Sequence, residues 1–434
     1  MGIFTRVIAA ATVAMAAWPA AAVDIQERTS PGGIPFWLVE EPSIPIVALE
    51  ISFPGGSRLD AEGQQGVTNL MTGLLEEGAG DLDATAFAIA RDDVSARFGF
   101  SSGRDSVEVS ARMLADQLEP SSALLALALS EPRFDENAIA RVRGQVLSQI
   151  AEKETNPSTQ ARETWFARAF PDHPYGRPRE GSAETVTAIT RDDLAAAHGR
   201  VLRRTGVHVA VVGAIDAEGA GALVDRVLGA LPEGATPDAE FEQIAPPPGV
   251  FVQELDVPQS VAIFGQQGLK RDDPDFIPAF VMNHILGGGG FSSRLITEVR
   301  EKRGLAYSTY AYLSPLDEAA VYLGGVSTAN ARISESLEVI QGEWRRMAED
   351  GVSEEELGKA KRYLTGAFPL RFDSNAKIAR YLVFMQEEGL GSNYLEIRNG
   401  LIEAVTVEDI ERVAGRLMDP DALSIVVVGK PAGL

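Results

Sequence analysis

The amino-acid sequence predicts an α+β fold with two homologous domains in tandem, each a mainly antiparallel sheet backed by helices on one face. Three observations lead to this prediction. Similar segments recur at a fixed offset of 216 residues, and other stretches alternate apolar and polar residues as half-buried strands do. Further stretches carry apolar residues at the 3.6-residue period of an amphipathic helix.

The internal repeat indicates a duplicated domain. Residues 188–194 (AITRDDL) recur as residues 404–410 (AVTVEDI). Each copy then leads into an apolar strand that ends at a glycine, Gly213 in the first copy and Gly429 in the second. Both pairs share the offset of 216 residues, and a repeat of this length is typical of a duplicated domain rather than a solenoid.

The domain boundaries follow from the repeat and from one Pro-rich segment. We expect an N-terminal domain at residues 23–230 and a C-terminal domain at residues 250–434. Residues 231–249 contain five prolines and several acids, a composition that is typical of an extended linker.

Local patterns predict individual elements within the domains. Residues 47–53 form an apolar strand, and residues 104–113 alternate as a strand with one buried face does. Apolar residues within 66–80 and within 138–152 follow the helical period. In the second domain, residues 260–264 form the strand that matches residues 47–53.

Residues 1–22 have the pattern of a cleavable signal peptide. Arg6 supplies the positive charge, residues 7–22 are apolar and rich in alanine, and small residues at 20–22 offer a cleavage site. The run is short for a membrane span, which requires about 20 apolar residues, although an uncleaved anchor is the alternative. We therefore expect an exported, periplasmic protein with no integral membrane span.

Charge and composition exclude several classes of function. The net charge of −23 argues against a nucleic-acid partner, because phosphate binding requires clustered Lys and Arg. The absence of cysteine excludes disulfides, thiolate metal sites and a cysteine nucleophile. The four histidines show no i, i+4 spacing, so none of them forms a recognisable zinc motif.

One predicted helix lies where a zinc motif would be expected. Residues 56–58 (GSR) precede it, and this arrangement resembles active members of the pitrilysin/insulinase family of zinc peptidases, whose corresponding helix carries His-x-x-Glu-His. In that motif two histidines one turn apart bind Zn²⁺ and the glutamate activates a water molecule. Here the three positions hold Asn69, Thr72 and Gly73, which offer neither an imidazole nor a carboxylate.

The resemblance also implies a third zinc ligand, a glutamate on the helix predicted at residues 138–152. The best alignment places Val142 at the ligand position and Gln149 at a supporting position. Glu136 and Glu152 flank the site, so an alignment shifted by one turn is an open alternative. We expect this chain to bind no metal and no other cofactor.

The second domain keeps a different motif. Residues 286–295 (LGGGGFSSRL) and 298–308 (EVREKRGLAYS) resemble the glycine-rich turn and the Arg/Tyr pair of the family's C-terminal half. The resemblance implies that Arg300 and Tyr307 contact substrate at the zinc site of another half, where arginine offers a fork of donors and tyrosine a hydroxyl for an oxyanion. Without the resemblance, a solvated helix charge and a core aromatic residue are the alternative.

The resemblance extends over residues 26–429 and implies a half-size family member that pairs with a second chain. We expect a non-catalytic, substrate-engaging subunit of a peptidase, whose zinc is bound by a homologous partner chain and whose substrates are peptides. Alone, this chain would be inactive. The alternative is a peptide-binding or scaffold protein of the cell envelope that makes no catalytic contribution.

Overall fold

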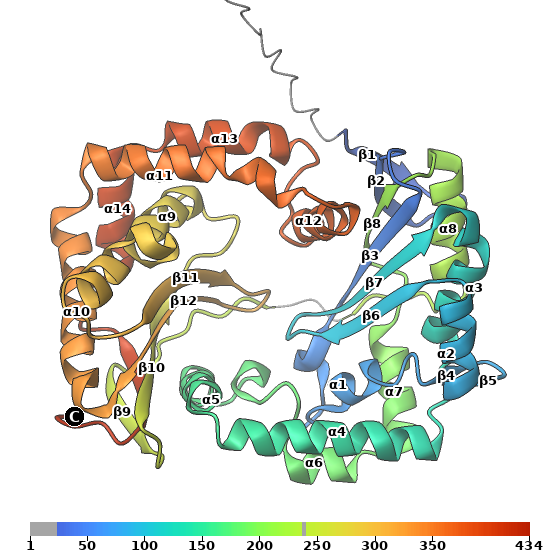
Figure 1. The fold of residues 1–434 in the computed structure, drawn as a ribbon, viewed down its shortest axis with the longest axis horizontal. Helices are drawn as coiled ribbons and strands as arrows, with labels where there is room; N and C mark the ends of the chain where they lie inside the picture. Colours follow the sequence, from blue (N-terminus) through green and yellow to red (C-terminus); the bar gives the residue numbers. More distant parts are fainter. Residues whose placement is uncertain (1–23, 237–239) are drawn as a thin grey trace, which may run out of the picture.

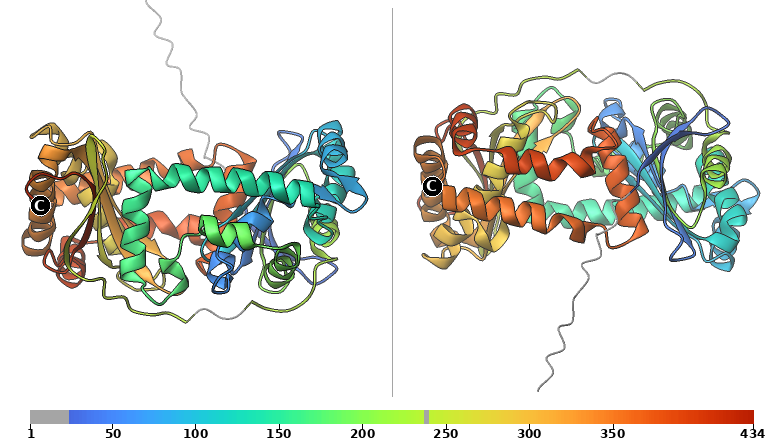
Figure 2. Two further views of the ribbon diagram at one scale, coloured as in Figure 1. Left: turned by 90° about the horizontal axis from the view of Figure 1, so that it is seen from below. Right: turned by 90° about the horizontal axis from the view of Figure 1, so that it is seen from above.

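The computed structural model describes residues 24–236 and 240–434, so the predicted signal peptide at residues 1–22 lies outside the described residues. The chain forms two halves that face each other (Figure 1). We call residues 24–230 the first half and residues 249–434 the second half. Between them, residues 231–236 and 240–248 contain no helix or strand and follow one edge of the molecule (Figure 2).

The first half contains eight strands and eight α-helices among its described residues. The strands are β1 (Gln26–Thr29), β2 (Pro35–Glu40), β3 (Ile46–Pro54), β4 (Gly78–Ala79), β5 (Leu82–Asp83), β6 (Arg97–Ser102), β7 (Ser106–Leu114) and β8 (His208–Gly213). The helices are α1 (Val67–Thr72), α2 (Ala84–Asp93), α3 (Leu118–Ser130), α4 (Glu136–Glu154), α5 (Pro157–Ala169), α6 (Ala183–Ala188), α7 (Arg191–Val201) and α8 (Ala217–Leu228).

The second half repeats this plan with fewer strands. Its strands are β9 (Gly249–Glu254), β10 (Gln259–Gln267), β11 (Ser308–Pro315), β12 (Ala320–Ala329) and β13 (Ser424–Gly429). Its α-helices are α9 (Phe276–Asn283), α10 (Ile333–Asp350), α11 (Glu354–Gly366), α12 (Asn375–Glu387), α13 (Tyr394–Ala404) and α14 (Val407–Leu417). Two π-helical segments, η4 (His284–Gly288) and η6 (Ile296–Glu301), lie between α9 and β11.

Each half is built on one large sheet. The first sheet has the order β1-β2-β8-β3-β7-β6 and the second the order β11-β12-β10-β13-β9. Their strand pairs are antiparallel except for β2 with β8 and β9 with β13. The predicted class, two tandem α+β domains with mainly antiparallel sheets, is therefore confirmed.

The repeat seen in the sequence corresponds to equivalent elements. Helices α7 and α14, and strands β8 and β13, begin 216 residues apart. Both helices start with the same capping box, in which the hydroxyls of Thr190 and Thr406 accept hydrogen bonds from the amides of Asp193 and Asp409 at 3.2 Å. In turn, each aspartate carboxylate accepts a hydrogen bond from the backbone amide of its threonine, so the two helices start with the same pair of hydrogen bonds.

Each sheet packs its own helices on one face and a single helix from the other half on the opposite face (Figure 1). Helix α5 belongs to the first half but covers β10 and β13, where its Trp165 is fully buried against Val261 and Val426. The indole Nε1 of Trp165 also donates a hydrogen bond of 3.0 Å to the carbonyl oxygen of Ser424.

Helix α12 makes the reciprocal contact. It belongs to the second half but covers β3 and β8, where Leu382 packs with Ala48 and Val212. The Nε2 atom of Gln386 donates to the carbonyl oxygen of Val209 at 3.0 Å. Sequence periodicity indicates that such helices have an apolar face, but not that this face covers the sheet of the other half.

Two local features differ from expectation. The apolar stripe within residues 66–80 predicts a longer helix, but α1 ends at Thr72 because Gly73 is its C-cap and a tight turn follows. The alternation of residues 307–313 predicts a strand that begins at Tyr307, whereas β11 begins one residue later, at Ser308. No helix within residues 24–236 or 240–434 is long and apolar enough to cross a membrane.

Candidate functional site

Helix α1 is anchored from the side that faces the core. It begins after Gly66, whose φ of 89° is a left-handed conformation that glycine adopts without strain. The buried carboxylate of Asp60 accepts hydrogen bonds from the Gly66 amide and from the Thr68 hydroxyl. Burial raises the pKa of Asp60 to about 6. These hydrogen bonds hold the start of α1 in place and so fix the positions of Asn69 and Thr72 further along the helix.

The motif positions on α1 carry no metal-binding groups. Asn69 is half-buried and its Oδ1 accepts a hydrogen bond of 3.4 Å from the Ser102 hydroxyl on β6. Thr72 is 3% exposed and its hydroxyl donates to the carbonyl oxygen of Asn69 at 2.9 Å. Local hydrogen bonds therefore occupy both polar side chains, and neither is a good ligand for zinc.

The structure brings Gly73 next to Val142, as the family alignment implies. A Cβ atom at Gly73 would lie 3.1 Å from Val142 Cγ1, so α1 and α4 touch at this point. Val142 is buried and apolar. At the two positions where the resemblance implies an imidazole and a carboxylate, this chain has a glycine and an alkyl group, which cannot hold zinc.

The alternative ligands that the alignment left open do not reach this place. Glu136 and Glu152 are exposed, and they lie six residues before and ten residues after Val142 on the same helix. At 1.5 Å per residue these positions are about 9 and 15 Å away along α4. Among the described residues, no group of three His, Asp or Glu side chains could hold a metal ion.

Arg300 and Tyr307 lie together in the second half. The guanidinium of Arg300 is 4.6 Å from the ring centre of Tyr307 and 4.7 Å from that of Phe291. Arg300 is therefore held between two aromatic rings, and both rings are exposed, Tyr307 at 79% and Phe291 at 69%. This exposure contradicts the alternative that Tyr307 is a core aromatic residue.

The surrounding backbone explains this placement. Segment η6 carries Arg300 and ends at a turn where Gly304 adopts a φ of 59°, and the Gly304 amide donates to the carbonyl oxygen of Arg300 at 2.9 Å. Tyr307 follows immediately before β11. Within the part of the chain that the structure describes, the Arg300 side chain has no ion-pair partner. Its donors are available to a ligand.

The two candidate groups lie in different halves. Helix α1 belongs to the first half, and the Arg300–Tyr307 pair lies between η6 and β11 of the second half.

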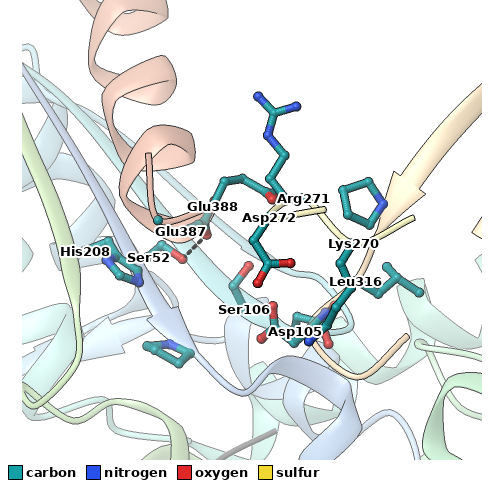
Figure 3. Close-up of a pocket in the computed structure, with 14 residues that line it drawn as sticks. Ser52, Asp105, Ser106, His208, Lys270, Arg271, Asp272, Leu316, Glu387 and Glu388 are labelled. Carbon is teal, nitrogen blue, oxygen red and sulfur yellow. Dashed lines mark hydrogen bonds between the residues drawn. The ribbon is translucent and has the colours of Figure 1, made fainter. Parts of the chain in front are cut away.

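A cavity of about 490 Å³ between the halves was missed by the sequence reasoning (Figure 3). We call it the acidic cavity, because five carboxyl groups line it: Asp105, Asp272, Asp317, Glu387 and Glu388. Burial raises the pKa of Asp317 to about 6 and that of Glu388 to about 7, and it also raises the pKa of Asp105 and Glu387. No local sequence pattern could reveal this cluster, since its members are scattered from residue 105 to residue 388.

The acidic cavity also contains Ser52 and His208, but not as a nucleophile and its base. The two residues are opposite each other on β3 and β8, yet the Ser52 hydroxyl donates to Glu387 (Figure 3). No hydrogen bond joins Ser52 and His208 among the described residues, and Ser52 is only 1% exposed. A serine hydrolase requires the hydroxyl to face both the base and the substrate, which this arrangement does not provide.

The chain matches two descriptions of one protein family. Residues 36–183 match "Insulinase (Peptidase family M16)" and residues 188–364 match "Peptidase M16 inactive domain". A solved structure of a peptidase M16 inactive domain from Pseudomonas fluorescens is 30% identical, with a TM-score of 0.88, and the match covers 94% of this chain and 98% of that one.

Similar full-length relatives carry contrasting names. An "Uncharacterized zinc protease" of Rickettsia bellii is 25% identical over 395 residues, which is 89% of this chain and 93% of the relative. The "Non-peptidase homolog YmxG" of Helicobacter pylori is 25% identical over 339 residues, 78% of each protein.

Proposed function

Because the chain belongs to the insulinase (M16) peptidase family, we propose that it is the non-catalytic, substrate-engaging subunit of a peptidase whose zinc is bound by a homologous partner chain. The substrates are peptides. This chain contributes Arg300 and Tyr307 and binds no metal itself.

One observation carries the proposal: Arg300 is held between two exposed aromatic rings and has no ion-pair partner among the described residues. Stacking on the two rings fixes the planar guanidinium, so less conformational entropy is lost when it binds a peptide carbonyl or carboxylate. An arginine that serves only as a solvated surface charge does not require two aromatic rings to hold its guanidinium in place. The zinc-ligand positions hold no metal-binding side chain, so the proposed role does not include metal-dependent catalysis by this chain. These positions are Asn69, Thr72, Gly73 and Val142.

The strand that follows Tyr307 supports peptide binding. Strand β11 is an edge of the second sheet, paired on one side only, with β12. An open edge offers unpaired amide and carbonyl groups to an extended peptide. A peptide along β11 would start next to Tyr307, whose hydroxyl can donate to an oxyanion formed at the partner's zinc site.

Export is a further part of the proposal and rests on the sequence of residues 1–22, with its positive end, apolar run and small-residue cleavage site. A periplasmic location would place the peptidase among peptides and unfolded proteins of the cell envelope.

The test uses the chain reconstituted with its homologous zinc-bearing partner. Arg300→Ala combined with Tyr307→Phe should lower kcat/KM for a fluorogenic peptide by about 100-fold or more, because one oxyanion donor alone contributes about 100- to 1,000-fold. Arg345→Ala, which removes a surface arginine whose ion pair with Asp421 spans 4.0 Å, is the control and should leave the rate unchanged.

Two outcomes would redirect the proposal. Unchanged turnover by the double variant in an intact assembly, verified by sedimentation velocity, would favour a scaffold role without catalytic contribution. Robust, chelator-sensitive cleavage by this chain alone with added zinc would refute the non-catalytic assignment.

A further inference from the structure

A second cavity between the halves, of about 640 Å³, has the opposite charge to the acidic cavity. Four cationic and two acidic side chains of the first half line it: Arg104, Lys153, Arg162, Arg179, Glu163 and Glu180. Strands β10, β11 and β12 of the second half complete its wall. We call it the cationic cavity. An excess of positive charge here contrasts with a chain whose net charge is −23.

The carboxylates present do not neutralise the four cations. Glu180 pairs with Lys153 at 2.7 Å and with Arg179 at 3.4 Å. Glu163 forms no ion pair within 4.0 Å among the described residues, and burial raises its pKa. Arg104 and Arg162 are thus left without a carboxylate partner in the described part of the chain.

Arg104 is the more deeply placed of these two arginines. Its guanidinium lies 4.0 Å from the ring centre of Phe166, and its Nε atom is buried without a hydrogen-bond partner among the described residues. Burial lowers the pKa of Arg104 to about 10, so the group stays charged at neutral pH. Arg104 as a whole is half-buried, and a partly buried charge without a carboxylate partner costs free energy that a bound anion would reduce.

Arg162 approaches the same cavity from α5. Its Nη1 donates to the hydroxyl of Tyr312 at 2.7 Å, a neutral partner that leaves the positive charge in place. Tyr310 lines the cavity and stacks with Tyr312, with ring centres 6.1 Å apart. The wall therefore combines guanidinium forks with aromatic and aliphatic surface, which suits part of a peptide better than a bare inorganic ion.

We propose that the cationic cavity binds a carboxylate of a peptide, either its C-terminal carboxylate or an Asp or Glu side chain, through Arg104 and Arg162. Guanidinium groups pair with carboxylates through two parallel hydrogen bonds. The inference deepens the proposed function and rests on it. Ser308, which lines the cavity, directly follows Tyr307, so a peptide engaged at Tyr307 would have the cavity within reach of its neighbouring residues.

The experiment measures binding of labelled peptides to the full chain by fluorescence anisotropy at neutral pH and about 50 mM salt. Three peptides are based on one uncharged sequence. The first has a free C-terminus, the second is amidated, and the third is amidated and has Glu in place of its central residue. We expect at least one carboxylate peptide to bind about tenfold more tightly than the amidated peptide without Glu. The peptide that gains affinity identifies the source of the carboxylate.

Variants locate the effect. Arg162→Gln should remove most of the tenfold preference while leaving the affinity for the uncharged peptide unchanged, and Arg104→Gln should do the same if it folds. Arg168→Gln is the matched control, because Arg168 lies on the same helix but stacks over Phe251 at 4.4 Å, outside the cavity. Its preference should equal that of the unchanged chain.

The outcomes separate the two proposals. Equal binding of all three peptides, insensitive to Arg162→Gln, would overturn the carboxylate site and leave peptide engagement intact. Failure of every peptide to bind would count against peptide engagement itself, and the carboxylate site would fall with it.

Discussion

Gly73 and Val142 are in contact: a Cβ atom at Gly73 would lie 3.1 Å from Val142 Cγ1, tighter than ordinary van der Waals packing. The end of α1 therefore touches α4 at this position, while Gly73 itself is exposed. The two positions that the family resemblance assigns to zinc ligands thus lie side by side and carry no metal-binding group.

This contact predicts coupling between the two positions. Gly73→His should lower the free energy of unfolding by about 1 kcal/mol or more, because the added atoms overpack against Val142. In a Val142→Ala background the same change should cost less, with a coupling energy of about 1 kcal/mol in a double-mutant cycle measured by urea unfolding. Additive effects of the two substitutions would contradict the contact.

The packing of helix α5 on the sheet of the other half depends on Trp165. Trp165→Ala should lower the free energy of unfolding by about 3–5 kcal/mol, because a fully buried indole is replaced by a cavity in the second sheet's covered face. Trp165→Phe should cost less, since it keeps an aromatic ring and loses the hydrogen bond to Ser424. A loss below about 1 kcal/mol for the alanine variant would show that α5 does not hold the halves together.

The two capping boxes should be equivalent in energy. Thr190→Ala and Thr406→Ala should each cost about 1 kcal/mol, because each removes the acceptor for the third amide of its helix. Thr187→Ala, at an exposed position inside α6, is the control and should change the free energy of unfolding by less than either. Unequal losses at the two caps would mean that surroundings, not the repeated local chemistry, set the cost.

The acidic cavity predicts that stability falls as pH rises. Asp317 and Glu388 have pKa values raised from 3.8 to about 6 and from 4.5 to about 7, so the folded chain binds protons that the unfolded chain releases. Their contribution is complete below the unfolded values and is lost as pH rises through about 6–7. Glu50, whose pKa burial also raises to about 7, acts in the same direction.

Urea unfolding at several pH values between 5.5 and 8.5 measures this dependence. Glu388→Gln should flatten it, because the amide cannot ionise beside Asp317, Glu387 and Asp105. His208 also lines the cavity, and burial lowers its pKa, so its own contribution to stability changes with pH in the opposite direction. Glu335→Gln on the exposed side of α10 should leave the slope unchanged. A slope of the opposite sign would refute the assignment.

Much of the fold could be predicted because its signals are local. The Thr-x-x-Asp caps, the apolar strands that end at Gly213 and Gly429, and the periodic stripe of α4 each lie within a few residues. The predicted strand at residues 104–113 corresponds to β7, and the predicted helix at 138–152 to α4. Such patterns specify an element without reference to the rest of the chain.

The remainder depends on contacts between distant residues. The stack of Arg300 on Phe291 and Tyr307 needs the turn at Gly304 to bring residues 291 and 307 together. Arg104 and Asp105 are neighbours in sequence, yet they line cavities of opposite charge. Only the packing of one half against the other determines which cavity each side chain enters.

The reciprocal packing of α5 and α12 also has a consequence during protein synthesis. The first sheet is complete once residue 213 has been made, but the helix that covers its second face spans residues 375–387. At about 5–20 residues per second the ribosome needs about 8–30 s to reach that helix, which is long compared with strand and helix formation. During this interval Ala48, Ala210 and Val212 face solvent or a chaperone. The first half thus keeps an uncovered apolar face until α12 of the second half is available to pack on it.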